Sequence, residues 1–381
     1  MNPTARGLTA RAAIFLPSLG GGGAEMHALR IANEAHWGEL RPEFVLSRQG
    51  GRYEPRIKAD LPITHLLPRW VRSSRLSMAL SVLPLRLWLK REKPDVLISF
   101  LNHTTVVAHL AMSGLKRRPK FVVGLQNNLS AEGKEWIGPS GAWFVKRLRT
   151  AHQEANAIVA LSKGVALDYR TFAPSNEAKV SVIHNAGYDD GVLTLGEAPV
   201  ELSKPRNLIV ACGRLTEQKD YPLMLRSFAL VRRTWESELW ILGEGHLRGS
   251  LLALAKDLGV ADSVRFLGFD PNPYRYMAMA DVFLLTSAWE GFGNVLVEAM
   301  ALGTPVVAAN CPHGPAEIIE DGVSGRLVDG REPDSFARVL AECLSSPALR
   351  LRLAEGGRMR SATFSARNVG SDYVRLVKLL V

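Results

Sequence analysis

Short apolar runs alternate with longer segments of helical periodicity along nearly the whole chain. This alternation restricts the fold more than any other feature, because it is typical of parallel α/β proteins, in which a helix follows each strand and packs on the sheet. In the first half we expect strands at RAAIFLP (11–17), EFVLS (43–47), DVLISF (95–100), KFVVGLQ (120–126), AIVALS (157–162) and KVSVIHN (179–185). In the second half we expect strands at NLIVACG (207–213), ELWILGEG (238–245), VRFLGF (264–269), DVFLLTS (281–287), TPVVAAN (304–310) and GRLV (325–328).

The length of 381 residues is more than one ordinary hydrophobic core needs, and we expect two domains. The polar, glycine-bearing segment 189–204 is the expected linker between a first domain at 1–188 and a second at 205–360. Residues 361–381 are expected to form a C-terminal helix that packs back on the first domain. Each domain would hold a doubly wound, Rossmann-like sheet, and two such sheets facing a central cleft would direct their strand carboxyl ends toward one ligand.

The composition indicates a folded protein, since hydrophobic residues make up 47% and charged residues 22% of the chain. No apolar run reaches the roughly 18–20 residues that a transmembrane helix needs. The N-terminal stretch MNPTARGLTARAAIFLP is expected to lead into a first strand, because its apolar part is too short for a signal peptide. Cys212, Cys311 and Cys343 are far apart and lack metal-ligand spacing, which favours a reduced, cytoplasmic compartment.

The positive charge of the chain is concentrated in its first half. Residues 1–190 contain 26 Lys and Arg against 15 Asp and Glu, whereas residues 191–381 contain 21 against 22. Arg69–Lys93 mixes basic residues with Trp and Leu, and KRRPK (116–120) and WFVKRLR (143–149) have the same character. Two interpretations fit this pattern: peripheral contact with an anionic membrane at the inner face of the cytoplasmic membrane, or a solvated helix face. Nucleic acid is disfavoured, because no nucleic-acid motif accompanies the charge.

Two glycine-containing turns follow expected strands and can approach an anion. Gly20–Gly23 lie between the first strand and a helix, where backbone N–H groups and the helix dipole favour phosphate, although Glu25 breaks the dinucleotide-binding pattern. The alternative is a tight turn without a ligand. In VACGRLTEQKDYPLML, Arg214 and Lys219 are five residues apart after a strand, so both can reach a diphosphate. Otherwise they are solvated surface cations.

Two glutamates are found around a further glycine turn, in EGFGNVLVE (290–298). Glu290 precedes an expected helix that starts near Asn294, and Glu298 lies on its second turn. Carboxylates bind vicinal hydroxyl groups well, because each oxygen accepts hydrogen bonds, so the pair suits a nucleotide sugar. The alternatives are helix capping for Glu290 and a solvated helix position for Glu298.

The segment 290–328, EGFGNVLVEAMALGTPVVAANCPHGPAEIIEDGVSGRLV, resembles the E-x7-E signature region of the retaining family-4 glycosyltransferases, which have the GT-B fold. Segments 20–34, 213–225 and 241–269 resemble other motifs of that family in the same order, and the resemblance extends over nearly the full chain. The version NCPHGPAEII (310–319) is most similar to members that assemble polysaccharides and other glycans.

The resemblance implies roles for individual donor-site residues. Arg214 and Lys219 would neutralise the diphosphate as it departs, and Glu290 would hold the hydroxyl groups of the donor sugar. Glu298 would bind the ribose hydroxyls, and Gly22 and Gly23 would approach the diphosphate from the first domain. The remaining donor contacts that the resemblance implies are base binding at Phe269 and sugar or phosphate contacts from Asn294 and the backbone amides of Phe292 and Gly293.

One departure from the family pattern concerns the acceptor side. Many members carry a histidine after the strand that corresponds to KFVVGLQ, where this chain has Gln126. His103 is the nearest alternative, and Gln126 and Asn127 could instead bind sugar or acceptor hydroxyls; a loop or helix-start position without catalytic role also fits His103. No D-x-D pair occurs in the sequence, so we expect no metal and no cofactor other than the nucleotide sugar.

The expected function is therefore transfer of one sugar from a nucleotide sugar, with UDP as the commonest nucleotide of the family, to a saccharide or lipid-linked acceptor. A soluble small-molecule acceptor and a non-catalytic protein that binds nucleotide sugars are the alternatives.

Overall fold

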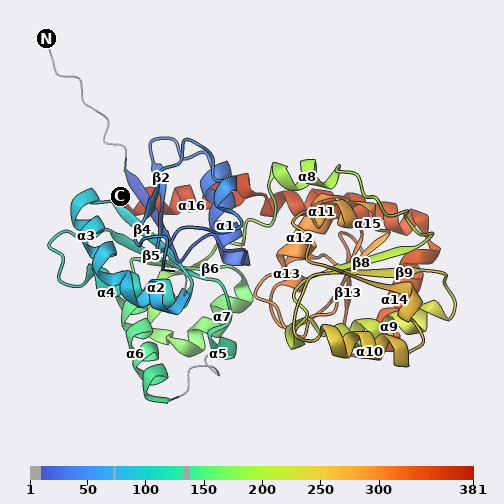
Figure 1. Ribbon diagram of the computed structural model, residues 1–381. Coiled ribbons are helices and arrows are strands. Elements are labelled where there is room, and N and C mark those ends of the chain that lie inside the picture. The colour runs from blue at the N-terminus through green and yellow to red at the C-terminus, as the bar shows by residue number, and fades with distance from the viewer. Residues whose placement is uncertain (1–9, 72–73, 133–137) are drawn as a thin grey trace, which may run out of the picture. The chain divides into compact units, whose positions relative to one another are not determined.

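The computed structural model describes residues 10–71, 74–132 and 138–381 (Figure 1). These residues form two compact units. Unit 1 contains the described residues up to Ala186 together with Ala366–Val381, and unit 2 contains Gly187–Ser365. Each unit has its own parallel sheet and its own hydrophobic core.

The sheet of unit 1 has seven strands in the order β3-β2-β1-β4-β5-β6-β7. Its strands, all parallel to their neighbours, are β1 (Arg11–Leu16), β2 (Arg41–Leu46), β3 (Ile63–His65), β4 (Val96–Phe100), β5 (Lys120–Leu125), β6 (Ala157–Ala160) and β7 (Val180–Val182). The central strands are almost completely buried, which explains why they read as continuous apolar runs. Edge strand β3 was not predicted; it has only three residues, and none of them is buried.

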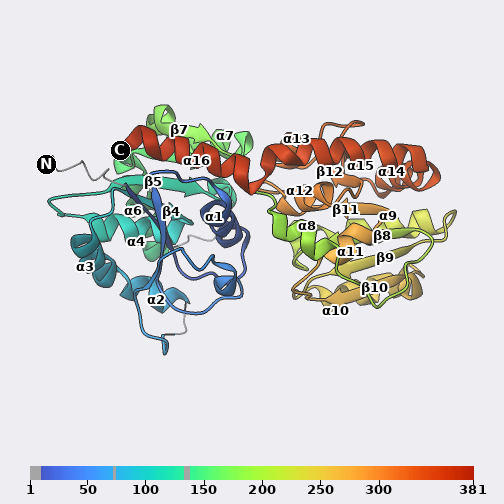
Figure 2. The same ribbon diagram turned by 90° about the horizontal axis from the view of Figure 1, so that it is seen from above.

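Helices connect the strands of unit 1 and cover its sheet. They are α1 (Gly23–Glu34), α2 (Ser74–Leu80), α3 (Val82–Glu92), α4 (Asn102–Met112), α5 (Leu129–Glu132), α6 (Gly138–Glu154), α7 (Lys163–Phe172) and α16 (Ala366–Leu380). The last helix, α16, lies beside α1 in both views (Figures 1 and 2). The approach is close, because a Cβ on Gly370 would lie 2.5 Å from the Cβ of Ala35.

A buried histidine joins α1 to α16 inside unit 1. His27 Nδ1 accepts the backbone N–H of Ala186 at 3.0 Å, and its Nε2 lies 3.2 Å from the Tyr373 hydroxyl. Burial lowers the pKa of His27 to about 3, and the positive charge of Arg30 acts in the same direction. Since the ring is neutral and Nδ1 is an acceptor, Nε2 carries the proton and donates to Tyr373. Residues 366–381 thus complete the core of unit 1.

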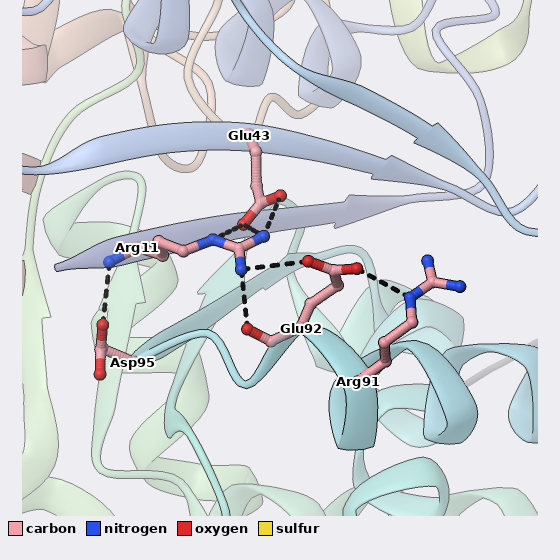
Figure 3. Close-up of polar contacts among 5 residues, drawn as sticks. All are labelled: Arg11, Glu43, Arg91, Glu92 and Asp95. Atoms are coloured by element: carbon pink, nitrogen blue, oxygen red, sulfur yellow. Dashed lines mark hydrogen bonds and ion pairs between the residues drawn. The ribbon is translucent and has the colours of Figure 1, made fainter. Parts of the chain in front are cut away.

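A polar cluster lies at the amino end of the same sheet, away from the strand carboxyl ends (Figure 3). The Arg11 guanidinium binds both carboxylate oxygens of Glu43, at 3.0 and 2.9 Å, and also the backbone carbonyl of Glu92 at 2.7 Å. The Glu92 carboxylate in turn accepts from Arg91 at 2.8 Å, and the Arg11 backbone N–H donates to Asp95 at 3.0 Å. These groups satisfy one another, so the cluster joins β1, β2 and the loop before β4.

Unit 2 has a six-stranded parallel sheet in the order β10-β9-β8-β11-β12-β13. The strands are β8 (Leu208–Cys212), β9 (Glu238–Leu242), β10 (Val264–Gly268), β11 (Val282–Leu285), β12 (Val306–Ala309) and β13 (Arg326–Val328), and all six were predicted from the sequence. The helices are α8 (Asp190–Gly196), α9 (Tyr221–Arg232), α10 (Arg248–Asp257), α11 (Tyr274–Met279), α12 (Asn294–Ala301), α13 (Pro315–Ile318), α14 (Pro333–Ser345) and α15 (Pro347–Ser361). Both units therefore have the doubly wound, Rossmann-like architecture that the alternating pattern predicts.

The segment between the two sheets is not a bare connection. All of residues 189–204 belong to unit 2, and within them α8 begins at an Asp189 side-chain cap and packs against α11. Gly187 at the start of unit 2 donates its N–H to the carbonyl of Phe364 at 2.8 Å, and Tyr188 pairs with Ser365. Over the residues that the structure describes, no helix combines the length and apolarity that a membrane span requires.

Candidate functional site

The strand order of unit 2 reverses between β8 and β11, because β9 and β10 lie on one side of β8 and β11 to β13 on the other. Ligands of open parallel sheets bind beside the carboxyl ends of the strands at such a reversal. Two loops flank it: residues 213–220 after β8 and residues 286–293 after β11. These are the loops in which the sequence places Arg214, Lys219 and Glu290.

Lys219 and Glu290 form an ion pair across the reversal. Lys219 Nζ lies 2.5 Å from Glu290 Oε1, and the Ser287 hydroxyl donates to the same oxygen at 2.6 Å. The two side chains are 15% and 7% exposed, so the pair is mostly shielded from water. Shielding strengthens electrostatic interactions of both groups, with each other and with a bound ligand. The structure therefore brings together two residues that are 71 positions apart in the sequence.

Arg214 lies in the same loop as Lys219 but differs from it in environment. It is exposed, and no acidic side chain within the described ranges pairs with it. An exposed guanidinium without a counter-ion at the carboxyl edge of a sheet is free to bind an anionic ligand. The loop around it is fixed from the next strand, since Gly213 N–H donates to the Leu242 carbonyl at 3.0 Å and Leu215 N–H to the Glu244 carbonyl at 2.9 Å.

The glycine turn before α12 has the backbone path that the sequence predicts. Gly293 has φ +105°, in the left-handed region that favours glycine, and α12 starts at Asn294. The Oδ1 atom of Asn294 is buried and accepts no hydrogen bond within the described structure. A buried acceptor without a donor is uncommon in proteins and is the kind of group that a ligand hydroxyl can satisfy.

Glu298 occupies the second turn of α12, as predicted, and is 8% exposed. The Tyr274 hydroxyl donates to its Oε1 at 3.4 Å. Burial raises the pKa of the nearby Cys212 thiol to about 12, and the negative charge of Glu298 acts in the same direction. Cys212 is therefore a protonated, unreactive thiol at neutral pH.

The two phenylalanines of the predicted donor site differ in burial. Phe269 directly follows β10, and its side chain is 48% exposed. Phe292 is 3% exposed and packs its ring edge-on against Phe364, with 5.4 Å between ring centres. The side chain of Phe292 thus belongs to the packing of the unit, whereas its backbone lies in the turn that leads to α12.

The remaining predicted residues belong to unit 1, where the strand order reverses between β1 and β4. Gly22 and Gly23 begin α1 after β1, and His103 begins α4 after β4. Gln126 and Asn127 follow β5, the strand next to β4. Burial lowers the pKa of His103 below its usual 6.5.

The start of α1 contains an internal carboxylate. Glu25 folds back over the turn, so that a Cβ on Gly22 would lie 2.3 Å from Glu25 Oε2. Burial raises the pKa of Glu25, while hydrogen bonds from the backbone of Glu25 and Gly22 partly oppose this rise. In this structure the Glu25 carboxylate thus accepts hydrogen bonds from backbone N–H groups of the turn that was predicted to bind phosphate.

Several polar groups of the site were not predicted from the sequence. Ser287 could have been found, because a hydroxyl residue directly after a strand and three residues before Glu290 is well placed to contact it. Tyr274 and Arg331 gave no such signal, since each reaches the site from a separate part of the chain. Among the described residues, no group of three or more His, Cys, Asp or Glu side chains could hold a metal ion.

Comparison with protein families gives two matches that follow one another along the chain. The model of Glycosyltransferase Family 4 matches residues 21–186, and the model of Glycosyl transferases group 1 matches residues 197–360. Together they include every predicted site residue.

Individual relatives agree with these matches. The lipopolysaccharide core biosynthesis glycosyltransferase LpsE of Rhizobium meliloti is 27% identical over 366 residues, which cover 93% of this chain and 96% of the relative. An N-acetylgalactosaminyltransferase of Campylobacter jejuni that acts on a diphospho-undecaprenol saccharide is 28% identical over 290 residues, or 74% of this chain and 75% of the relative. Among solved structures, Anabaena HepE in complex with UDP and glucose superimposes with a TM-score of 0.76 over 96% of this chain and 99% of that chain, at 21% identity, which supports the GT-B fold.

Proposed function

The chain belongs to the family 4, group 1 glycosyltransferases of GT-B fold, and from this premise we propose that it transfers a single sugar, with retained anomeric configuration, from a UDP-sugar to a saccharide or lipid-linked acceptor. The observation that carries the proposal is the shielded Lys219–Glu290 pair at the strand-order reversal of unit 2. It combines, at one place, a cation suited to a diphosphate and a carboxylate suited to sugar hydroxyls. Assembly of surface polysaccharide, lipopolysaccharide or another glycoconjugate is the proposed context.

The reaction breaks the bond between the anomeric carbon and the diphosphate oxygen and forms a bond from that carbon to the acceptor oxygen. Negative charge grows on the leaving diphosphate, and Lys219 and the exposed Arg214 are the groups proposed to stabilise it. The acceptor proton is proposed to pass to an oxygen of the departing phosphate. Glu290 is proposed to hold the sugar hydroxyls so that the anomeric carbon is correctly placed.

The ribose and the base of the donor are proposed to bind to side chains of unit 2 near the Lys219–Glu290 pair. Glu298, held by the Tyr274 hydroxyl, would accept from the ribose hydroxyls, and the exposed ring of Phe269 would stack on the base. The unpartnered Oδ1 of Asn294 and the backbone amides of Phe292 and Gly293 would contact the sugar and phosphates.

The residues proposed for unit 1 have separate roles. Gly22 and Gly23 would bring backbone amides to the diphosphate, which requires the Glu25 carboxylate to give up its place at that turn. His103, Gln126 and Asn127 would bind acceptor or sugar hydroxyls from the loops after β4 and β5.

A panel of nucleotides and nucleotide sugars tests the proposal directly. We expect UDP to raise the unfolding temperature and GDP and ADP to leave it unchanged, and we expect one UDP-sugar to be slowly hydrolysed. Because Lys219, Arg214 and backbone amides supply the positive field, the hydrolysis rate is expected to be the same with and without EDTA. Stabilisation without turnover of any donor would favour the non-catalytic alternative. Complete loss of activity in EDTA, restored by Mn²⁺, would contradict metal independence.

The acceptor is proposed to be lipid-linked because unit 1 exposes a combined apolar and basic surface. Four leucines along α2 and α3 recur at helical spacing and are 44–63% exposed: Leu76, Leu80, Leu83 and Leu87. Lys90 and Arg91 continue this face at the end of α3, and Trp70 before α2 is 75% exposed. Leucines, a Trp and terminal cations suit the interface of an anionic membrane. Arg72, which the sequence also points to, lies outside the described residues.

Vesicle binding separates this proposal from transfer to a soluble acceptor. We expect the protein to sediment with vesicles that contain phosphatidylglycerol, and the double variant Leu83→Ser/Leu87→Ser to lose most of this binding. Leu351→Ser on α15 of unit 2 is the control, since Leu351 is even more exposed than Leu83 and Leu87, at 72%, but lies outside unit 1. Equal sedimentation of both variants would favour the soluble acceptor.

A further inference from the structure

One arginine of unit 2, Arg331, binds both loops that carry the Lys219–Glu290 pair. It lies three residues after β13, and its guanidinium makes three contacts. Nη1 donates to the Ser287 carbonyl at 2.7 Å, and Nη2 donates to the Thr286 carbonyl at 2.8 Å. Nη2 also forms an ion pair with the Asp220 carboxylate. Arg331 thus joins the loop after β8 to the loop after β11.

Arg331 contacts the loop of Glu290 through the backbone carbonyls of Thr286 and Ser287, which precede Glu290. Ser287, whose carbonyl accepts from Arg331, directs its own hydroxyl to Glu290 Oε1 at 2.6 Å. Thr286 and Ser287 are both 0% exposed, so in this structure the guanidinium, and not water, donates to their carbonyls. The position of the Glu290 carboxylate therefore depends on a short backbone segment that Arg331 fixes.

Arg331 contacts the loop of Lys219 through the side chain of the next residue, Asp220. Asp220 has φ +43°, a left-handed conformation that is unfavourable for a residue with a Cβ. Such a conformation persists only where the surroundings hold it. Asp220 Oδ1 caps α9 by accepting from Leu223 N–H at 3.2 Å, while Oδ2 binds Arg331. The Thr286 hydroxyl completes the link by donating to the Lys219 carbonyl at 3.1 Å and the Asp220 carbonyl at 3.0 Å.

We infer that Arg331 is a positioning residue for the transfer reaction: it fixes the Lys219 ammonium and the Glu290 carboxylate relative to each other by binding the backbone beside each of them. This inference rests on the proposed function for its effect on catalysis, but not for the geometry. Arg331 is itself engaged by three acceptors, so it is not assigned to the donor phosphates. Two other bonds join the same loops, Ala288 N–H to the Gln218 carbonyl at 2.8 Å and the Gln218 amide to the Trp289 carbonyl at 3.1 Å, so loss of Arg331 should loosen the pair without unfolding the loops.

The test compares Arg331→Gln and Arg331→Lys with the matched control Arg326→Gln. Arg326 is on the same strand-loop segment and also forms ion pairs, with Asp321 and Glu342, but it starts β13 and so lies at the opposite end of the sheet. We expect Arg331→Gln to lower kcat for the UDP-sugar that the wild type hydrolyses by about 10- to 100-fold, because small misplacements of reacting groups have effects of this size. The KM should change several-fold less than kcat. Arg331→Lys keeps the positive charge but not the planar guanidinium, so its kcat should lie between those of the wild type and Arg331→Gln.

A second readout does not depend on turnover. The lysines are dimethylated with ¹³C-formaldehyde and a borane reductant, and the Lys219 signal is assigned with Lys219→Arg. We expect this signal to shift in Arg331→Gln and in Glu290→Gln, which removes the charge that Lys219 contacts, and to stay unchanged in Arg326→Gln. If no nucleotide sugar is hydrolysed by the wild type, the proposed function fails and this signal alone decides the inference.

The outcomes that overturn the inference are specific. An unchanged Lys219 signal in Arg331→Gln would do so even if kcat fell, because Arg331 would then act by another route. If Arg331→Gln does not fold, Arg331→Lys takes its place, and a wild-type kcat with a wild-type Lys219 signal in that variant would contradict the role of the planar guanidinium.

Discussion

Replacing Glu290 by glutamine is expected to lower the rate of sugar transfer by about 100- to 1,000-fold, the usual cost of removing one preorganised charged or hydrogen-bonding group from an active site. Glutamine has the same shape, so the turn before α12 should be preserved. What is lost is the negative charge that Lys219 Nζ contacts at 2.5 Å. The ammonium would keep its place with little access to water and without its counter-ion, and the sugar hydroxyls would lose a charged acceptor.

The matched control for this variant is Glu217→Gln. Glu217 lies two residues before Lys219 and pairs with His246, but its side chain is 67% exposed, so its removal should change the rate by less than about twofold. In a double-mutant cycle, Lys219→Met and Glu290→Gln should be strongly non-additive, because each removes the partner of the other. A Glu290→Gln enzyme with more than a fifth of the wild-type rate would show that the pair is structural only.

Replacing Gly243 by alanine is expected to destabilise unit 2 by more than about 3 kcal/mol and to abolish donor binding. Gly243 follows β9 with φ +129°, and a Cβ there would lie 2.0 Å from the backbone carbonyl oxygen of Gly213. No side-chain rotation can relieve this overlap, because both partners are backbone. The chain must move at Gly213, next to Arg214, so the cation proposed to bind the diphosphate would be displaced together with the fold.

Alanine substitutions at two other glycines of unit 2 separate the cost of backbone strain from the cost of the steric overlap at Gly243. Gly259 has φ +70° and open space around its Cβ position, so Gly259→Ala measures backbone strain alone and should cost about 1–2 kcal/mol. Gly249 lies in α10 with open space and an ordinary φ, so Gly249→Ala should be neutral or stabilising by up to about 1 kcal/mol. Chemical denaturation of the three variants gives the comparison. Gly243→Ala with the same loss as Gly259→Ala would disprove the backbone overlap.

The architecture and part of the site could be predicted because they depend on local signals. Continuous apolar runs predict buried parallel strands, and glycine turns before helices predict where the loops at the sheet edge begin. Glu290, Glu298 and Lys219 follow from such turns together with the family motifs. Edge strand β3 was not predicted, because it has only three residues, one exposed and two half-buried, and is too short to show a periodic pattern.

The contacts within the site could not be predicted, because they join residues that are distant in sequence. Arg331 is a single arginine in a polar loop, and its partner Asp220 is 111 positions away. The inward fold of Glu25 over Gly22 was also unexpected: the sequence marks Glu25 only as a break in a dinucleotide pattern, whereas the structure has it beside the backbone donors that a phosphate would use. Whether these backbone N–H groups donate to a carboxylate of the protein or to the phosphate of a ligand depends on side-chain conformation, which the residue type alone does not determine.

The pairing of Gly187 and Tyr188 with Phe364 and Ser365 has a consequence for engineering. The chain enters and leaves unit 2 at neighbouring, hydrogen-bonded positions, the arrangement of a domain inserted into a host. A chimaera that exchanges Gly187–Ser365 for the corresponding part of a relative therefore needs only two adjacent junctions, and the host keeps its own last helix, with Tyr373 still bound to His27. Because the proposed donor-binding groups of unit 2 move with this segment, we expect donor preference to be transferred with it.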